Sequence, residues 1–257
     1  MKKCLVILGF LILASPALVY SDILSFKLGY FMPRAQSDPN SLWTTEFDNM
    51  SFKKSNFYGS IFSLGYEHFL TNEISLGLSV DHYSRNRSGF YRDYVGVSLT
   101  EGDFAFPAQD FLGDFDISHS FQVSMTPIQL SLKLTPLGRR IKLIPYVGGG
   151  VGFYIWNVRL RGEIVDFTDV WIYTDPDLGD IDIYGVKLAD LEETNRFSVG
   201  YHAFGGFMYA LGPRFTVEAE FKYHFVKGKW KSDSSFVDFS DFDLSGAQVT
   251  VGLNYWF

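Results

Sequence analysis

The chain is almost without cysteine: in 257 residues the single cysteine is Cys4. A disulfide-stabilised scaffold is therefore excluded. Beyond residue 21 the chain also lacks any uninterrupted apolar run of 18 residues, the length typical of a helix that spans a membrane. Basic residues are fewer than acidic ones, 22 against 29. This balance argues against nucleic acid as a partner, because phosphate binding needs clustered lysine and arginine.

The first 21 residues have the pattern of an export signal. Two lysines precede an apolar run at residues 5–13, and small residues precede a cleavage point after Ser21. The pattern predicts a cleaved signal peptide at 1–21 and a single domain at 22–257. Cleavage removes the cysteine and both leading lysines, so the formal charge of −7 becomes −9. We expect no thiol chemistry in the mature protein.

What the chain does have is strict alternation of apolar and polar residues. In residues 215–225, every odd position is apolar and every even position is polar. Successive strand side chains point to opposite faces, so this pattern predicts a strand with one apolar face. Seven more segments follow the same rule, at about 24–30, 57–68, 74–80, 121–134, 145–157, 196–211 and 246–257.

One of these segments changes phase. The apolar residues lie at odd positions in 121–125 and at even positions in 128–134. A slip of one residue would turn every following side chain to the opposite face. The change of phase therefore predicts a β-bulge at Thr126-Pro127, where a sheet tolerates the missing N–H of proline.

The connections between the eight segments alternate in length. Short ones lie near 70–73, 136–141 and 212–214, and long ones near 33–56, 84–117, 158–195 and 227–244. An even number of strands with this alternation is typical of an outer-membrane barrel. We predict an all-β fold: an eight-stranded antiparallel transmembrane β-barrel with short periplasmic turns and long extracellular loops. Eight strands leave an interior that side chains can fill, so we expect a plugged barrel.

Two segments and the C-terminus carry a family resemblance. Met125-Thr126-Pro127-Ile128-Gln129-Leu130-Ser131-Leu132-Lys133, Pro145-Tyr146-Val147-Gly148-Gly149-Gly150-Val151-Gly152-Phe153-Tyr154 and the terminal aromatic resemble the small outer-membrane β-barrel superfamily, and within it the outer-membrane protein W family. The resemblance implies a place in the outer membrane of a Gram-negative-type bacterium and passage of small hydrophobic molecules. It also implies that the last strand, with Tyr255 and Phe257, is the signal read by the barrel-assembly machinery.

The polar face of the strands carries seven charged residues. They are Lys27, Glu67, Asp81, Lys133, Glu218, Glu220 and Lys222. Their charges nearly balance, which favours mutual neutralisation inside the lumen over a selective pore lined by one sign.

Two histidines also lie on the predicted inner face. A turn at 212–214 that places Leu211 opposite Phe215 also places His202 opposite His224. Two imidazoles alone do not complete a metal site, so no metal and no cofactor are predicted.

The loop at 158–195 is strongly acidic and also aromatic. Ten acids occur from Glu163 to Glu193, and their oxygens suit divalent cations bridged to lipopolysaccharide. A solvated acidic surface is the favoured explanation, and divalent cations are the alternative. A weak helical signal lies at 186–194. Aromatic residues interleave with acids at 171–173 and 236–242. Extended strands that rise beyond the membrane would show this mixture, and so would a mouth that binds a ligand or a surface that contacts another cell.

The most enzyme-like fragment is His82-Tyr83-Ser84. Alternation puts His82 and Ser84 on one outward face, in an arrangement similar to that of outer-membrane lipid A deacylases. No carboxylate follows in the same phase, so no catalytic residue is predicted and we expect no enzyme. The leading hypothesis is a non-enzymatic outer-membrane protein, structural or admitting small hydrophobic molecules. Adhesion or ligand binding through the loops is second, and lipid A modification is third. Outer-membrane lipids are expected partners in every case.

Overall fold

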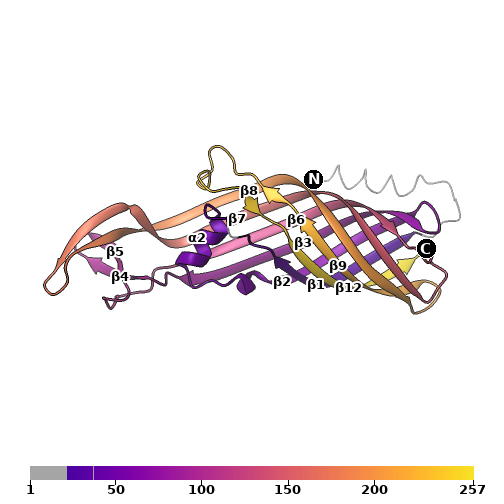
Figure 1. Ribbon diagram of the computed structural model, residues 1–257, viewed down its shortest axis with the longest axis horizontal. Coiled ribbons are helices and arrows are strands. Elements are labelled where there is room, and N and C mark those ends of the chain that lie inside the picture. Colours follow the sequence, from indigo (N-terminus) through magenta and orange to yellow (C-terminus); the bar gives the residue numbers. More distant parts are fainter. Residues whose placement is uncertain (1–21, 37) are drawn as a thin grey trace.

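Eight strands form a closed ring in the computed structural model, which describes residues 22–36 and 38–257 (Figure 1). In ring order they are β1 (Ile23–Pro33), β2 (Gly59–Phe69), β3 (Ile74–Phe90), β6 (Ser118–Leu134), β7 (Leu143–Asp175), β8 (Gly179–Ala210), β9 (Phe215–Phe225) and β12 (Gly246–Trp256). Each is antiparallel to its neighbours, and β12 pairs with β1 to close the ring. The predicted eight-stranded antiparallel barrel is confirmed, while the predicted signal peptide lies outside the described residues.

The remaining elements lie in three of the four long connections. The helix α2 (Leu42–Asn49) and the 3-10 helix η1 (Lys54–Phe57) join β1 to β2. The hairpin β4 (Tyr94–Leu99) and β5 (Gly102–Pro107) lies between β3 and β6, and the short pair β10 (Lys227–Gly228) and β11 (Phe242–Asp243) lies between β9 and β12. Within the described residues, no helix is long and apolar enough to cross a membrane.

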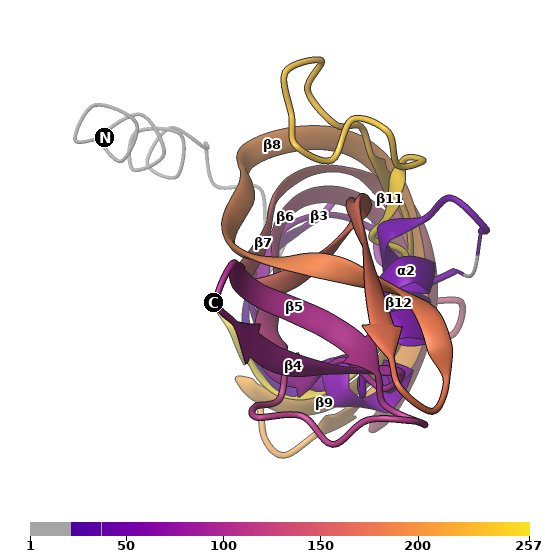
Figure 2. The same ribbon diagram turned by 90° about the vertical axis from the view of Figure 1, so that its left-hand side faces the viewer.

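The fourth long connection is a continuation of the barrel strands. β7 and β8 stay paired from the barrel to a turn at 176–178, with register shifts after Trp156 and after Asp166. The helical signal at 186–194 is therefore wrong, because cross-strand pairing with β7 outweighs a weak local preference in a short acidic stretch. Figure 1 shows this hairpin as a long projection from the barrel, and in Figure 2 β4 and β5 lie beside its end, where β5 pairs with β8.

The predicted bulge at Thr126-Pro127 is also wrong. β6 keeps one register along its whole length against β7, with Met125 opposite Trp156 and Ile128 opposite Phe153. The odd positions point inward throughout: Met125 is buried, whereas Ile128 is 38% exposed. What changes is the medium. Beside lipid the outward residues are apolar, and above it the outside is water, so the inward residues are the apolar ones.

The mouth of the barrel is filled by an apolar cluster. Trp43 of α2 lies in it, with ring centroids 5.1 Å from Phe242 and Phe57 and 5.2 Å from Phe121. Its indole N–H donates to the Asp243 carbonyl at 2.9 Å, so the one polar atom of the ring is satisfied. The helix begins at Ser41, whose hydroxyl accepts the Thr44 N–H. The buried side of α2 carries Leu42, Trp43 and Glu46, and the two apolar residues belong to the cluster at the mouth.

Candidate functional site

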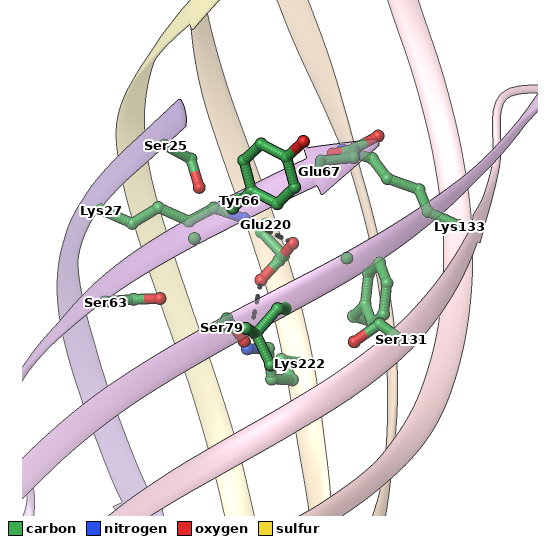
Figure 3. A pocket seen from close by; sticks show the side chains of 14 residues that line it. Ser25, Lys27, Ser63, Tyr66, Glu67, Ser79, Ser131, Lys133, Glu220 and Lys222 are labelled. Atoms are coloured by element: carbon green, nitrogen blue, oxygen red, sulfur yellow. Dashed lines mark hydrogen bonds and ion pairs between the residues drawn. The ribbon is translucent and has the colours of Figure 1, made fainter. Parts of the chain in front are cut away.

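The lower lumen holds a network of ion pairs (Figure 3). The Lys27 amine lies 2.8 Å from Glu220 and 3.2 Å from Glu218, both on β9. The Lys133 amine lies 2.8 Å from Glu67 and 3.5 Å from the same Glu218. All of these side chains are buried or nearly so, so each charge is balanced by a neighbour rather than by solvent.

The third lysine of the network joins it to the upper lumen. The Lys222 amine lies 3.0 Å from Asp81 and 3.8 Å from Glu220, and it donates to Gln129 Oε1 at 2.9 Å. The structure thus brings together all seven charged residues that alternation placed on the inner face. The sequence analysis did not predict that Gln129 belongs to this network, because alternation places an uncharged amide on the polar face without indicating its hydrogen-bond partner.

The two lumen histidines are cross-strand partners, but their ring nitrogens face different groups. His202 Nε2 lies 2.8 Å from Ser131 Oγ. His224 Nε2 lies 2.8 Å from Gln248 Oε1, and its Nδ1 lies 3.1 Å from the Tyr154 hydroxyl. Each imidazole is a member of a hydrogen-bond network. No group of three or more candidate metal ligands occurs among the residues that the structure describes.

Little open space remains in the lumen. A cavity of about 50 Å³ is lined by four serines and by charged residues of the ion-pair network, which are Ser25, Ser63, Ser79, Ser131, Lys27, Glu67, Lys133, Glu220 and Lys222 (Figure 3). A second one, of about 10 Å³, lies beside Trp43. A volume of this size holds one water or a few. The described part of the lumen holds the ion-pair network, an aromatic cluster at the mouth and a smaller apolar cluster at the end with the short turns, which contains Ile23, Phe69, Ile144 and Met208.

A buried acid–base pair crosses the mouth. Glu46 Oε2 of α2 lies 2.8 Å from His119 Nε2 on β6, and His119 Nδ1 lies 3.3 Å from the Glu163 carbonyl. The Tyr91 ring packs edge-on against His119, and burial raises the pKa of Tyr91 to about 12. The sequence analysis missed this pair, because no local pattern connects a helix in one loop to a strand 73 residues away.

The far end of the β7–β8 hairpin has a small core of its own. Phe104 and Phe106 of β5 pack with Ile183 of β8, and the Phe106 ring centroid lies 5.1 Å from that of Tyr173. β5 pairs with β8 through Phe104 and Ala105, so the β4–β5 hairpin supports the end of the β7–β8 hairpin. We call residues 167–183 the tip.

The acids of the hairpin fall into two groups. The acids near the barrel form ion pairs. The Asp190 carboxylate accepts hydrogen bonds from two nitrogens of the Arg159 guanidinium, at 2.8 and 2.9 Å, and the Asp166 carboxylate lies 2.6 Å from the Lys187 amine. The Lys187 hydrogen bond and those from Thr168 hold the pKa of Asp166 well below its usual range. The predicted binding of divalent cations at 158–195 stays a prediction.

The pair His82 and Ser84 lies on the outward face, as the alternation indicates. His82 Nδ1 lies 2.9 Å from Thr126 Oγ1, and its ring packs against Phe62. No carboxylate ion-pairs with His82 in the described part of the chain. The absence of enzyme activity remains a prediction.

The outer wall is apolar on every strand of the ring. One such residue from each strand is exposed by 38–64%: Phe26, Leu64, Leu78, Leu130, Val151, Val199, Val217 and Val251. In a closed ring every backbone N–H and C=O can pair with a neighbouring strand, and an apolar outer wall suits lipid while the charged side chains stay inside. The chain has the fold of an eight-stranded transmembrane β-barrel.

Solved structures with a similar fold include other barrels. Neisserial surface protein A is 10% identical with a TM-score of 0.45, over 92% of this chain and 97% of that chain. A major outer membrane protein from Thermus thermophilus is 12% identical with a TM-score of 0.42, over 92% and 99%. The outer membrane protease OmpT from Escherichia coli is 14% identical with a TM-score of 0.35, over 95% and 99%. At these levels of identity, the likeness to these structures extends to the fold alone.

No protein-family model matches the barrel, and no curated protein matches it. The resemblance to the outer-membrane protein W family therefore stays a prediction, as does the assembly signal. The two residues of that signal lie at the end of the closing strand: the Tyr255 ring stacks on Phe257, 6.2 Å between centroids. The Phe257 backbone exchanges two hydrogen bonds of 3.1 Å with Asp22, which fastens the two described ends together.

Proposed function

We propose that this barrel is a surface-binding protein, which acts as an adhesin or ligand-binding module through the tip of its β7–β8 hairpin. The observation that carries the proposal is the length of the two strands, 33 and 32 residues. Residues 163–175 of β7 extend beyond the last residue of β7 that pairs with β6, and at about 3.3 Å per residue they span roughly 40 Å along the strand. A barrel with a purely structural role has no need of a braced projection of that length.

The surface of the tip supports contact with another molecule. Val170, Trp171 and Ile172 are exposed by 52%, 48% and 71%, and Leu178 in the turn by 54%. Val170 and Ile172 share one face of β7, because alternate strand residues point to the same side. Apolar side chains exposed together mark interaction sites more often than single exposed residues do.

The charges of the tip indicate the kind of partner. Asp177, Asp180 and Asp182 are exposed, and in the described structure none of them forms an ion pair with lysine or arginine. The acids nearer the barrel, in contrast, are paired with Arg159 and Lys187. The tip therefore suits a partner that carries both cationic and apolar groups.

The alternative function, admission of small hydrophobic molecules, gains less support from the same molecule. The aromatic cluster around Trp43 leaves about 10 Å³, and the lower cavity among the serines is polar. A route through the wall would need these side chains to move. Recordings in planar bilayers address the pore directly, and large stable conductance steps from the native protein would favour the alternative.

Retention of cells tests the proposal. A non-adherent bacterial host expresses the native chain or a tip variant, V170S/I172S/D177N/D180N/D182N. Retention is counted on cultured epithelial cells and on a coat of basement-membrane proteins. We expect the native chain to raise retention on at least one surface about tenfold over the empty host, and the tip variant to lose most of that gain.

The matched control is L112S/L188S, which removes the exposed leucines at 100% and 87% exposure outside the tip. Retention by this control should equal that of the native chain. Equal retention by the tip variant and the native chain, at equal surface levels, contradicts the proposal, and so does a native chain that binds no better than the empty host.

A further inference from the structure

One edge of β7 has no neighbouring strand along the tip. β6 pairs with β7 only as far as His119, which lies opposite Gly162. Just above, the Val165 N–H donates to the Tyr91 hydroxyl at 3.2 Å. In the part of the chain that the structure describes, residues 170–175 of β7 pair with β8 and with no other strand, and their backbone forms no hydrogen bond with another element. We call this unpaired side of residues 170–175 the open edge.

The strand that carries the open edge is held firmly from its other sides. β8 pairs with all six residues in a single register. The Trp171 ring centroid lies 5.3 Å from that of Phe104. The Tyr173 ring centroid lies 5.1 Å from that of Phe106, so β5 supports the same strand through its side chains. Because the strand is already ordered, pairing with a further strand costs it little conformational entropy.

The residues of the open edge favour pairing with another strand. Proteins protect an exposed edge with lysine, with proline or with a covering element. Residues 170–175 contain neither lysine nor proline, and all but the last are β-branched or aromatic, which suits a strand. Alternate residues direct their backbone groups to the same edge, so roughly three of the six present an N–H and a C=O outward. These groups are ready to pair with an extended chain.

The charges around the open edge disfavour a second copy of this chain as the occupant. The tip contains no lysine or arginine but five aspartates, which are Asp169, Asp175, Asp177, Asp180 and Asp182. A second copy would bring five more carboxylates to the same surface, and like charges on neighbouring strands repel one another. Asp169 lies 3.4 Å from the Lys187 amine, but none of the other four forms an ion pair with lysine or arginine in the described structure. The occupant that fits is a basic segment of another molecule.

The alternation of the two strands decides where the basic side chains of that segment belong. Asp182 lies opposite Ile172 and Asp180 opposite Thr174, so these carboxylates share the face of Ile172. A strand added at the open edge lies about 5 Å from β7 and about 10 Å from β8. From there a lysine or arginine can lay its aliphatic stem along Ile172 and reach toward Asp182. On the other face the added residues lie beside Trp171, which favours apolar side chains.

We infer that the open edge of β7 binds an extended polypeptide segment by strand addition, and that lysine or arginine alternates with apolar residues in this segment. Backbone hydrogen bonds supply affinity in this mode of binding, and the side chains on the two faces supply specificity. The inference rests on the proposed function of the tip. It adds the chemical class of the partner and the way in which the partner is held.

Two peptides of equal charge test the mode of binding. The full-length native protein in detergent is titrated with a fluorescein-labelled octapeptide of alternating lysine and valine, and fluorescence anisotropy reports binding. The second octapeptide has the same side chains but carries methyl groups on the backbone nitrogens of two lysines and two valines, which blocks both of its edges. We expect the first peptide to bind about tenfold more tightly. It alone should slow hydrogen exchange within residues 170–175, at roughly three amides.

Two charge-matched variants test the chemistry of the partner. D180N/D182N removes two exposed acids of the tip and should weaken binding of the first peptide about fivefold. D238N/D241N removes two exposed acids of another loop and should leave binding unchanged. Equal affinity of the native protein for the two peptides overturns strand addition, as does unchanged exchange within residues 170–175 or a lack of binding to either peptide. Equal binding by D180N/D182N and the native protein overturns the basic partner.

These outcomes are separate from those of the cell-retention assay, which tests the proposed function. Retention that depends on the tip, together with equal binding of the two peptides, removes strand addition and leaves the proposed function in place. A preference for the first peptide without retention on either surface removes the proposed function and leaves the open edge as a peptide-binding site.

Discussion

Glu46 of α2 and His119 of β6 form a buried pair that fastens the helix inside the mouth, with Oε2 2.8 Å from Nε2. The other ring nitrogen of His119 faces the Glu163 carbonyl, which can only accept. The carboxylate of Glu46 and the carbonyl of Glu163 thus hold the imidazole from its two nitrogen atoms.

Removing the carboxylate should loosen the mouth. We expect Glu46→Ala to lower the free energy of unfolding by about 3 kcal/mol, because it leaves a buried imidazole without its partner. Glu46→Gln should cost less, since its amide can still donate to Nε2. Urea unfolding followed by tryptophan fluorescence measures this loss. His68→Ala, which breaks the more exposed pair with Asp22, is the control and should cost less than Glu46→Ala. A loss of stability no greater than that of His68→Ala contradicts the assignment.

The lumen network should respond to the loss of one lysine. Lys222→Met leaves Asp81 and Glu220 without this cation, and unpaired buried charges of this kind cost about 3–5 kcal/mol. We expect a lower urea midpoint and a lower temperature of heat-modified migration on gels. Lys229→Met, at an exposed loop position, is the matched control. Equal midpoints for the two variants would mean that Lys222 does not neutralise the lumen.

The hairpin should depend on pH through Asp166. Hydrogen bonds from Lys187 and Thr168 lower the pKa of Asp166 below the ordinary value of 3.8. A depressed pKa in the folded state contributes stability that is complete above the unfolded value and is lost as the pH falls through the folded value. Hydrogen exchange of residues 163–187 should thus be faster in Asp166→Asn than in the native protein at pH 6. The difference should shrink below about pH 4.

Asp177→Asn is the control for this measurement, because Asp177 is an exposed turn residue without an ion pair in the described structure. Its exchange should match that of the native protein across the range. A difference between Asp166→Asn and native that persists undiminished at pH 2 would count against the ion pair as the cause.

Alternation and turn lengths predicted most of the barrel. The turn at 212–214 predicted that His202 lies opposite His224, and the structure pairs these residues. The phase change in β6 was interpreted as a bulge because periodicity reports only which face a residue shares. Phe121 and Leu130 are both apolar, but Phe121 is buried inside the mouth and Leu130 faces lipid. The local pattern does not indicate whether lipid or water lies outside the wall at a given residue.

The sequence by itself determined the ring of eight strands, its apolar wall and the inner face of its charges, since lipid allows only closed structures and a two-residue period assigns every side chain a side. Only the tertiary structure decided which of those side chains touch. Trp43 meets Phe242, and Arg85 meets Asn56, because ring closure and loop folding bring together residues that no short-range rule connects. The length of the β7–β8 hairpin is likewise a property of the tertiary structure, because pairing between the two strands outweighs the weak helix propensity of residues 186–194.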